Sequence, residues 1–186
     1  DEFVKINKEN SKEKITIAKR IAEKDSKKEK EFWKIFHAAI KPKRNAEDIY
    51  AKIANLDVLF LTTNCDGLLV KHFPYSYSVD CTREVYSKHS KEEYVFCLHG
   101  NWGKGTKKEK ERLIFTEDKY LSAYQPGNSL PVFLREVMRD KTVLFIGYGL
   151  NEFEIINAGF IPAEQKGPLK HYVWEGFFDY QKEFCY

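Results

Sequence analysis

Side chains that could take part in catalysis or ligand binding follow an apolar run in the segment FLTTNCDGLL, residues 60–69. The run Val58–Leu61 ends in two threonines, and an amide, a thiol, a carboxylate and a glycine come next: Asn64, Cys65, Asp66 and Gly67. An amide donates and accepts hydrogen bonds and a carboxylate accepts them, whereas a thiol can be a nucleophile or a metal ligand. The same residue types are ordinary turn formers and helix caps, so this segment alone does not separate a site from a turn.

Two other apolar runs end in comparable groups. One ends in Leu98, His99, Gly100 and Asn101, and a later one ends in Ile146, Gly147, Tyr148, Gly149 and Leu150. Taken singly, His-Gly is a common loop dipeptide, and Gly-Tyr-Gly before a helix can be only a tight turn. In an open parallel sheet, however, ligands bind beyond the carboxyl ends of the strands. The three strand ends together therefore predict a ligand site at that edge of a sheet.

Short apolar runs predict the strands that position these groups. Several are hydrophobic on successive positions, which is typical of strands buried on both faces of a parallel sheet: residues 57–63, 93–100, 112–116, 141–149 and 171–175. Helix candidates lie between them at residues 67–72, 117–124, 130–139 and 151–158, and residues 103–112 are predicted to be a hairpin or surface loop. The alternation predicts an α/β, Rossmann-like fold, with a mostly parallel sheet flanked by helices.

The N-terminal segment has a different, helical pattern. Apolar residues recur there at spacings of three and four, namely Ile15, Ala18 and Ala22 and then Phe32, Phe36 and Ile40. The wholly polar stretch Asp25–Lys30 leaves open whether this is one long helix or two. Pro42 ends the pattern, and Asn45 can cap a further helix through Ile53. We therefore predict a helical, basic segment over residues 1–44 and an α/β domain over residues 45–186.

Composition limits the class of protein and its partners. Residues 1–44 hold 14 basic and 8 acidic side chains, but these are interspersed, which favours a solvated helix surface and leaves nucleic-acid binding open. The net charge of +3 gives no strong case for nucleic acid.

No apolar run approaches the roughly 18 residues of a membrane span, and no secretory segment is present. The four cysteines form no C-x-x-C pair, so we expect a reducing, cytoplasmic setting without membrane contact. Spacing argues against zinc at Cys81, Cys97 and His99, and no metal is expected.

Four segments in this order resemble the sirtuin-like NAD-consuming domain, in the branch found in bacterial antiphage-defence proteins: FLTTNCDGLL, VFCLHGNW, LIFTEDKYLSAY and VLFIGYGLNEFEI. The resemblance runs from Asp57 to about Trp174. The family's T-x-N-x-D motif falls on Thr62, Thr63, Asn64, Cys65 and Asp66, its catalytic histidine on His99, and its ribose-contacting turn on Gly147, Tyr148 and Gly149. The paired C-x-x-C zinc ligands of deacetylase-type sirtuins have no counterpart in this sequence.

The resemblance implies NAD+ as the substrate and its hydrolysis to ADP-ribose and nicotinamide through an oxocarbenium-like state. It implies that Asn64 positions a water or a ribose hydroxyl and that His99 binds a ribose hydroxyl and acts as general base. It also implies NAD contacts at the remaining motif positions, with Asp66 on the nicotinamide carboxamide and Cys65 in the wall of the nicotinamide pocket. A non-catalytic module that senses NAD or ADP-ribose derivatives, and a protein deacylase, remain alternatives.

Glycine placement bears on how NAD could bind. A dinucleotide-binding half normally opens with a strand, a glycine-rich turn and a helix, and the family has that turn upstream of T-x-N-x-D. The first glycine of this chain is Gly67. We therefore expect an incomplete domain that works with an additional domain or partner subunit, and we expect homo-oligomers. The isolated chain is predicted to bind NAD weakly or not at all.

Overall fold

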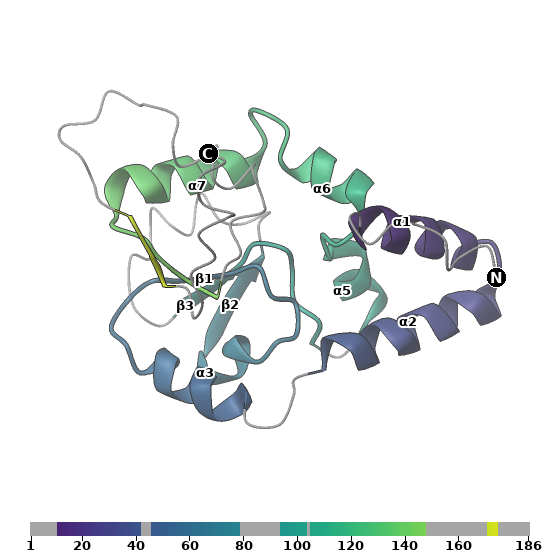
Figure 1. Cartoon of the computed structure of the whole chain (residues 1–186), viewed down its shortest axis with the longest axis horizontal. Helices are drawn as coiled ribbons and strands as arrows, with labels where there is room; N and C mark the ends of the chain where they lie inside the picture. Colours follow the sequence, from purple (N-terminus) through teal and green to yellow (C-terminus); the bar gives the residue numbers. More distant parts are fainter. Residues whose placement is uncertain (1–10, 42–45, 79–93, 104, 148–170, 175–186) are drawn as a thin grey trace, which may run out of the picture. The chain divides into compact units, whose positions relative to one another are not determined.

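The computed structural model describes residues 11–41, 46–78, 94–103, 105–147 and 171–174. The chain divides into two compact units, Asp1–Gln125 and Pro126–Tyr186. Figure 1 shows the helices and strands of both units along the chain.

A three-stranded parallel sheet lies in the first unit (Figure 1). Its strands are β1 (Phe60–Thr62), β2 (Tyr75–Ser78) and β3 (Tyr94–Cys97), in the order β1-β3-β2. Phe60 lies opposite Val95 and Thr62 opposite Cys97, so the carboxyl ends of β1 and β3 are neighbours. Parallel strands flanked by helices confirm the predicted α/β class.

Four of the five predicted strands are present, and one prediction is wrong. Two of them are β1 and β3 in the first unit. The other two form a parallel pair in the second unit, β4 (Leu144–Ile146) and β5 (Tyr172–Trp174). Residues 112–116 are not a strand. Leu113 and Thr116 are buried, but Leu113 is buried by aromatic side chains, and the backbone N–H of Ile114 donates to the His99 carbonyl oxygen at 3.0 Å. Strand β2, with the sequence YSYS, was missed because it has no apolar run.

Two helices form the N-terminal segment, which resolves the alternative left open by its polar middle. They are α1 (Ser11–Ala22) and α2 (Ser26–Ile40), and Asp25 caps α2 by accepting from the backbone N–H of Lys27 at 2.8 Å. Helix α1 contacts α2 and also α6 (Glu117–Ala123). The buried Thr16 hydroxyl accepts the backbone N–H of Glu117 at 2.8 Å, so α1 satisfies a donor at the start of α6.

An aromatic cluster fastens α2 to the segments that follow β3. The ring centroids of Trp33 and Trp102 are 5.5 Å apart, and those of Phe36 and Phe115 are 4.5 Å apart. Trp33, Trp102 and Leu113 are the buried members of this cluster. The consequence is that the end of α2 lies near the residues that follow the carboxyl end of β3.

The predicted loop over residues 103–112 is also wrong, because it contains helix α5 (Lys107–Arg112). Thr106 is its N-cap, and Glu109 completes a capping box. The Glu109 backbone N–H donates to Thr106 Oγ1 at 3.3 Å, and the Thr106 N–H donates to Glu109 Oε2 at 2.7 Å. The T-x-x-E spacing that forms this box was present in the sequence.

Other helices complete the two units. Helix α3 (Ala46–Ala54) precedes β1, the 3-10 helix η2 (Leu69–His72) follows it, and the proposed cap at Asn45 lies outside the described residues. In the second unit, α7 (Ser129–Asp140) has one buried apolar face, made by Leu130, Phe133, Leu134, Val137 and Met138. The predicted helix over residues 151–158 lies outside the described residues. No described helix is long and apolar enough to cross a membrane.

Candidate active site at the ends of strands β1 and β3

The segments that leave β1 and β3 are joined by backbone hydrogen bonds. The Leu98 N–H donates to the Thr62 carbonyl oxygen at 2.8 Å, and the Trp102 N–H donates to the Cys65 carbonyl oxygen at 2.8 Å. Two of the three predicted strand ends therefore meet. Of the third predicted strand end, Tyr148 and Gly149 lie outside the described residues, and Gly147 belongs to the second unit.

Asn64 is exposed and is held by a residue of α3. Its Nδ2 donates to the Tyr50 hydroxyl at 2.9 Å, and its backbone N–H donates to Thr62 Oγ1 at 3.1 Å. Burial raises the pKa of the Tyr50 hydroxyl, so this group is protonated near neutral pH. Thr62 is buried and Thr63 is half-buried. The amide of Asn64 is thus accessible and oriented, as a group that positions a small molecule should be.

His99 is buried directly after β3. It is 6% exposed, and its Nε2 lies 2.8 Å from the Tyr124 hydroxyl. The edge-on rings of Tyr120 and Tyr124 enclose the imidazole, with centroid distances of 5.7 and 5.9 Å. Tyr124 fixes the orientation of the ring. It ends the segment LIFTEDKYLSAY that resembles the family, but its contact with His99, 25 residues earlier, was not predicted.

Gly100 is required by the path of the chain after His99. Its φ is +82°, and a Cβ at this position would lie 2.9 Å from the backbone oxygen of Arg112. A residue with a side chain would therefore be strained and would push the Arg112 segment away. The backbone of the His-Gly dipeptide is therefore in close contact with the backbone of Arg112.

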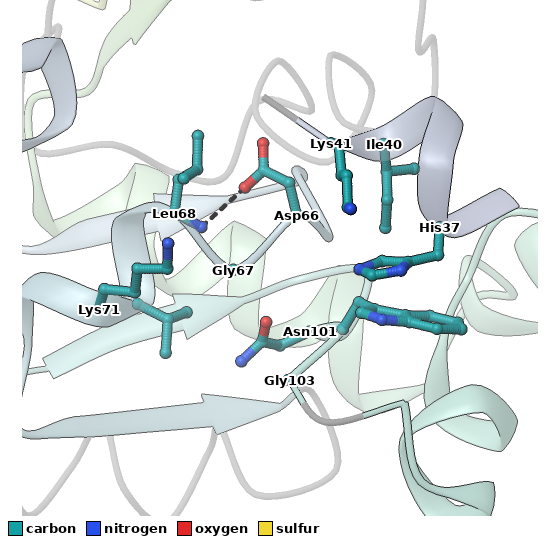
Figure 2. A pocket seen from close by; sticks show the side chains of 11 residues that line it. His37, Ile40, Lys41, Asp66, Gly67, Leu68, Lys71, Asn101 and Gly103 are labelled. Carbon is teal, nitrogen blue, oxygen red and sulfur yellow. Dashed lines mark hydrogen bonds between the residues drawn. The ribbon is translucent and has the colours of Figure 1, made fainter. Parts of the chain in front are cut away.

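Asp66 lies at a pocket of about 510 Å³ (Figure 2). Its Oδ1 accepts the backbone N–H of Leu68 at 2.9 Å, which fixes the carboxylate at the turn through Gly67. Three segments line the pocket: His37, Ile40 and Lys41 at the end of α2, then Asp66, Gly67, Leu68, Val70 and Lys71, then Asn101, Trp102 and Gly103. The His37 ring stacks on Trp102, with centroids 5.2 Å apart and an interplanar angle of 17°.

The pocket has both apolar and polar walls, and its polar walls include the side chains of Lys41 and Lys71. Apolar walls of Ile40, Leu68, Val70 and Trp102 accompany the Asp66 carboxylate and the Asn101 amide, and such a mixture is usual for small-molecule sites. Of the predicted site residues only Asp66 lines it, whereas Asn64 and His99 do not. The α2 residues were missed, because the helical periodicity of α2 carried no indication of a ligand site.

Cys65 packs against the aromatic cluster and does not line the pocket. Burial, with a smaller contribution from the Asp66 charge, raises the pKa of its thiol. Burial also raises the pKa of the Cys97 thiol from 9.0 to about 11. A protonated, enclosed thiol is a poor nucleophile, so the structure gives neither cysteine the properties of a catalytic thiol.

Cys97 is expected to alkylate slowly in the folded protein. At pH 8 a pKa of about 11 leaves about 100-fold less thiolate than a pKa of 9.0 does, so iodoacetamide should modify Cys97 at least about 100-fold more slowly than in the urea-unfolded protein. The rate should rise as pH rises toward 11, since deprotonation follows the raised pKa. Site-resolved mass spectrometry measures both rates, and equal rates in the folded and unfolded protein would contradict the prediction.

Comparisons with known proteins agree with the sequence resemblance. The profile of a family described as a SIR2-like domain matches residues 58–173. Defense-associated sirtuin 2 from Bacillus subtilis is 30% identical to this chain over 99 residues. The aligned region is 51% of this chain and 10% of that protein, so the chain spans only a small part of the relative's length.

Proposed function

Because this chain belongs to the SIR2-like domain family, we propose that it is the NAD+-consuming domain of a bacterial antiphage-defence protein. Its reaction is the hydrolysis of NAD+ to ADP-ribose and nicotinamide. The defence role is supported by the similarity to Defense-associated sirtuin 2, and the predicted sirtuin-like class is confirmed by the family match.

One observation carries the proposal. The T-x-N-x-D motif on residues 62–66 and the His-Gly dipeptide on residues 99–100 leave neighbouring parallel strands at the same end of the sheet, beside the pocket that Asp66 lines. Ligand sites of open parallel sheets occupy this edge. The departure of both motif segments from the same edge of the sheet supports a shared site.

In the proposed reaction the protein binds the leaving group and supplies a water molecule. Asp66 accepts an N–H of the nicotinamide carboxamide, and Asn64, oriented by Tyr50, holds the water or a ribose hydroxyl. The ribose–nitrogen bond breaks with its electron pair leaving on nicotinamide, and the water oxygen bonds to the ribose carbon. His99 receives the proton that the water loses, with Tyr124 holding the imidazole ring.

Contacts to the pyrophosphate are proposed to come from an additional domain or a partner subunit. A glycine-rich turn normally provides them, and no glycine precedes Gly67 in this sequence. The relative in which this region is only 10% of the length has ample additional chain. Self-association and a cytoplasmic location stay predictions from the sequence.

A second candidate function is a non-catalytic module that binds NAD or an ADP-ribose derivative. The burial of His99 supports it, because the ring is 6% exposed and does not line the pocket. Such a module needs no general base. Its ligand affinity should therefore survive the replacement of His99 by alanine, whereas hydrolysis should not.

Replacing Asn64 by alanine tests the proposed function. In the complete native protein, Asn64→Ala is expected to lower the rate of nicotinamide and ADP-ribose formation by about 100-fold, since an oriented nucleophile is worth at least that much. Asn55→Ala is a matched control, because Asn55 is also exposed and does not line the pocket. Product formation that is undiminished in Asn64→Ala, or absent from the unaltered protein, contradicts the hydrolase proposal.

A further inference from the structure

Helix α6 is held at its start by a side chain of α1. It has only 7 residues, and a helix this short depends on tertiary contacts more than on its own backbone. Its N-cap, Thr116, makes no side-chain cap hydrogen bond to this fully described helix. The first backbone N–H of α6, that of Glu117, instead donates to the buried Thr16 hydroxyl at 2.8 Å. The two helices lie side by side and are joined by this bond (Figure 1).

A second contact from α1 reaches an aromatic ring of α6. Lys12 Nζ lies 3.4 Å from the centroid of the Tyr120 ring, which is the geometry of a cation–π interaction. The Thr16 hydroxyl donates to the Lys12 carbonyl oxygen at 2.7 Å. Lys12 and Thr16 are four residues apart and therefore share the face of α1 that contacts α6.

Tyr120 connects this contact to His99. Its ring meets the imidazole edge-on at a centroid distance of 5.7 Å and packs on the Tyr124 ring at 4.5 Å. The Tyr124 hydroxyl in turn lies 2.8 Å from His99 Nε2. Tyr120 belongs to α6 and Tyr124 is its C-cap. A displacement of α6 therefore moves both of the side chains that enclose the imidazole.

We infer that Thr16 and Lys12 are positioning residues that hold His99 in place through α6. The inference rests on the proposed function, in which His99 is the general base. A general base is effective only while it is correctly placed, and a displacement of about 1 Å can cost about 100-fold in rate. Helix α1 ends at Ala22, whereas the family match begins at residue 58. A helix outside the matched residues thus supports the catalytic histidine.

The first test measures NAD+ turnover by the complete native protein. Thr16→Val leaves the Glu117 N–H unpaired and is expected to lower kcat by about tenfold, the loss of one buried hydrogen bond. KM should change by less than about twofold, because α1 and α6 contribute no residue to the pocket lining. Lys12→Met should lower kcat by about threefold, the loss of the cation–π contact. Thr142→Val and Lys28→Met are matched controls at exposed positions outside α1 and α6, and they should match the unaltered protein.

A double-substitution cycle separates positioning of His99 from a general loss of structure. In a His99→Ala background, Thr16→Val should lower kcat no further, since its effect passes through the imidazole. A loss of structure would instead lower kcat equally in both backgrounds. That outcome, or an undiminished kcat in Thr16→Val alone, overturns the inference.

Chemical modification tests the inference without turnover. Diethyl pyrocarbonate acylates accessible imidazole nitrogens, and His99 should react slowly because it is 6% exposed. Thr16→Val should raise the rate at His99 by about tenfold, since α6 opens more often when it loses this hydrogen bond. The exposed His72 is the internal reference, and its rate should not change. Site-resolved mass spectrometry of the complete native protein measures both rates, and equal rates at His99 in the two proteins overturn the inference.

The modification rates also separate the inference from the proposed function. Faster modification of His99 in Thr16→Val, in a protein that does not cleave NAD+, would reject the hydrolase proposal and support the connection from α1 to His99. The circular dichroism spectrum establishes that Thr16→Val is folded. If it is not, Lys12→Met replaces it in both tests, with an expected change of about threefold.

Discussion

Replacing His99 by alanine is expected to lower the rate of NAD+ cleavage by about 100- to 10 000-fold in the complete native protein, the usual contribution of a general base. The imidazole is buried directly after β3 with Nε2 at 2.8 Å from the Tyr124 hydroxyl, and β3 pairs with β1, the strand that leads into the T-x-N-x-D motif. Nicotinamide release under saturating NAD+ measures the effect.

Two further variants separate catalysis from loss of structure. His72→Ala removes an exposed imidazole at the end of η2, outside the pocket lining, and should leave the rate unchanged. Tyr124→Phe keeps the ring that packs on His99 but removes the hydroxyl, so it should lower the rate by about tenfold, through the loss of one orienting hydrogen bond. A rate in His99→Ala equal to that of the unaltered protein would instead favour the ligand-sensing alternative.

Phe96→Ala is expected to lower the free energy of unfolding by about 3–5 kcal/mol, the range for truncating a buried phenylalanine. Phe96 is 0% exposed and lies on the central strand β3, opposite Leu61 on one side and Tyr77 on the other. Its removal leaves a cavity at the centre of the three-stranded sheet. Urea unfolding followed by tryptophan fluorescence reports on this region, since Trp33 and Trp102 belong to the same unit as Phe96.

The matched control for Phe96 is an exposed apolar residue of the same unit. Leu121 on α6 is 59% exposed, and Leu121→Ala should change the free energy of unfolding by no more than about 0.5 kcal/mol. If both variants unfold at the same urea concentration, the central position of Phe96 in the core is wrong.

Sequence patterns predicted the parts of the fold where local and tertiary preferences agree. The run around Val95 is apolar because both faces of β3 are buried, and β1 buries Phe60 beside it while Leu61 is half-buried, so the predicted strands β1 and β3 exist. Residues 112–116 have the same pattern for a different reason, namely burial of Leu113 against Trp33 and Trp102 without strand pairing. An apolar run therefore reports burial, and it identifies a strand only where a partner strand is available.

In the candidate site, too, contacts that follow from strand pairing could be predicted, whereas contacts made only through tertiary packing could not. The grouping of the Asp66 and His99 strand ends followed from parallel pairing of β1 with β3. The presence of His37 and Lys41 in the pocket wall could not be predicted in this way. It depends on packing between α2 and Trp102, and no local sequence pattern encodes which surface a helix will cover. Tyr50 and Tyr124 escaped prediction for the same reason, since each meets its partner through tertiary structure.

The docking of α2 on Trp102 has a practical consequence for where this domain can be cut. The family match begins at residue 58, whereas α2 ends at Ile40. A protein trimmed to the matched residues would lose the His37 ring that stacks on Trp102 and one wall of the pocket, and it would present the Trp102 and Leu113 side chains to water. Such a protein should aggregate and bind ligands poorly. We therefore expect the functional boundary of the domain to lie before α2, outside the limits of the family match.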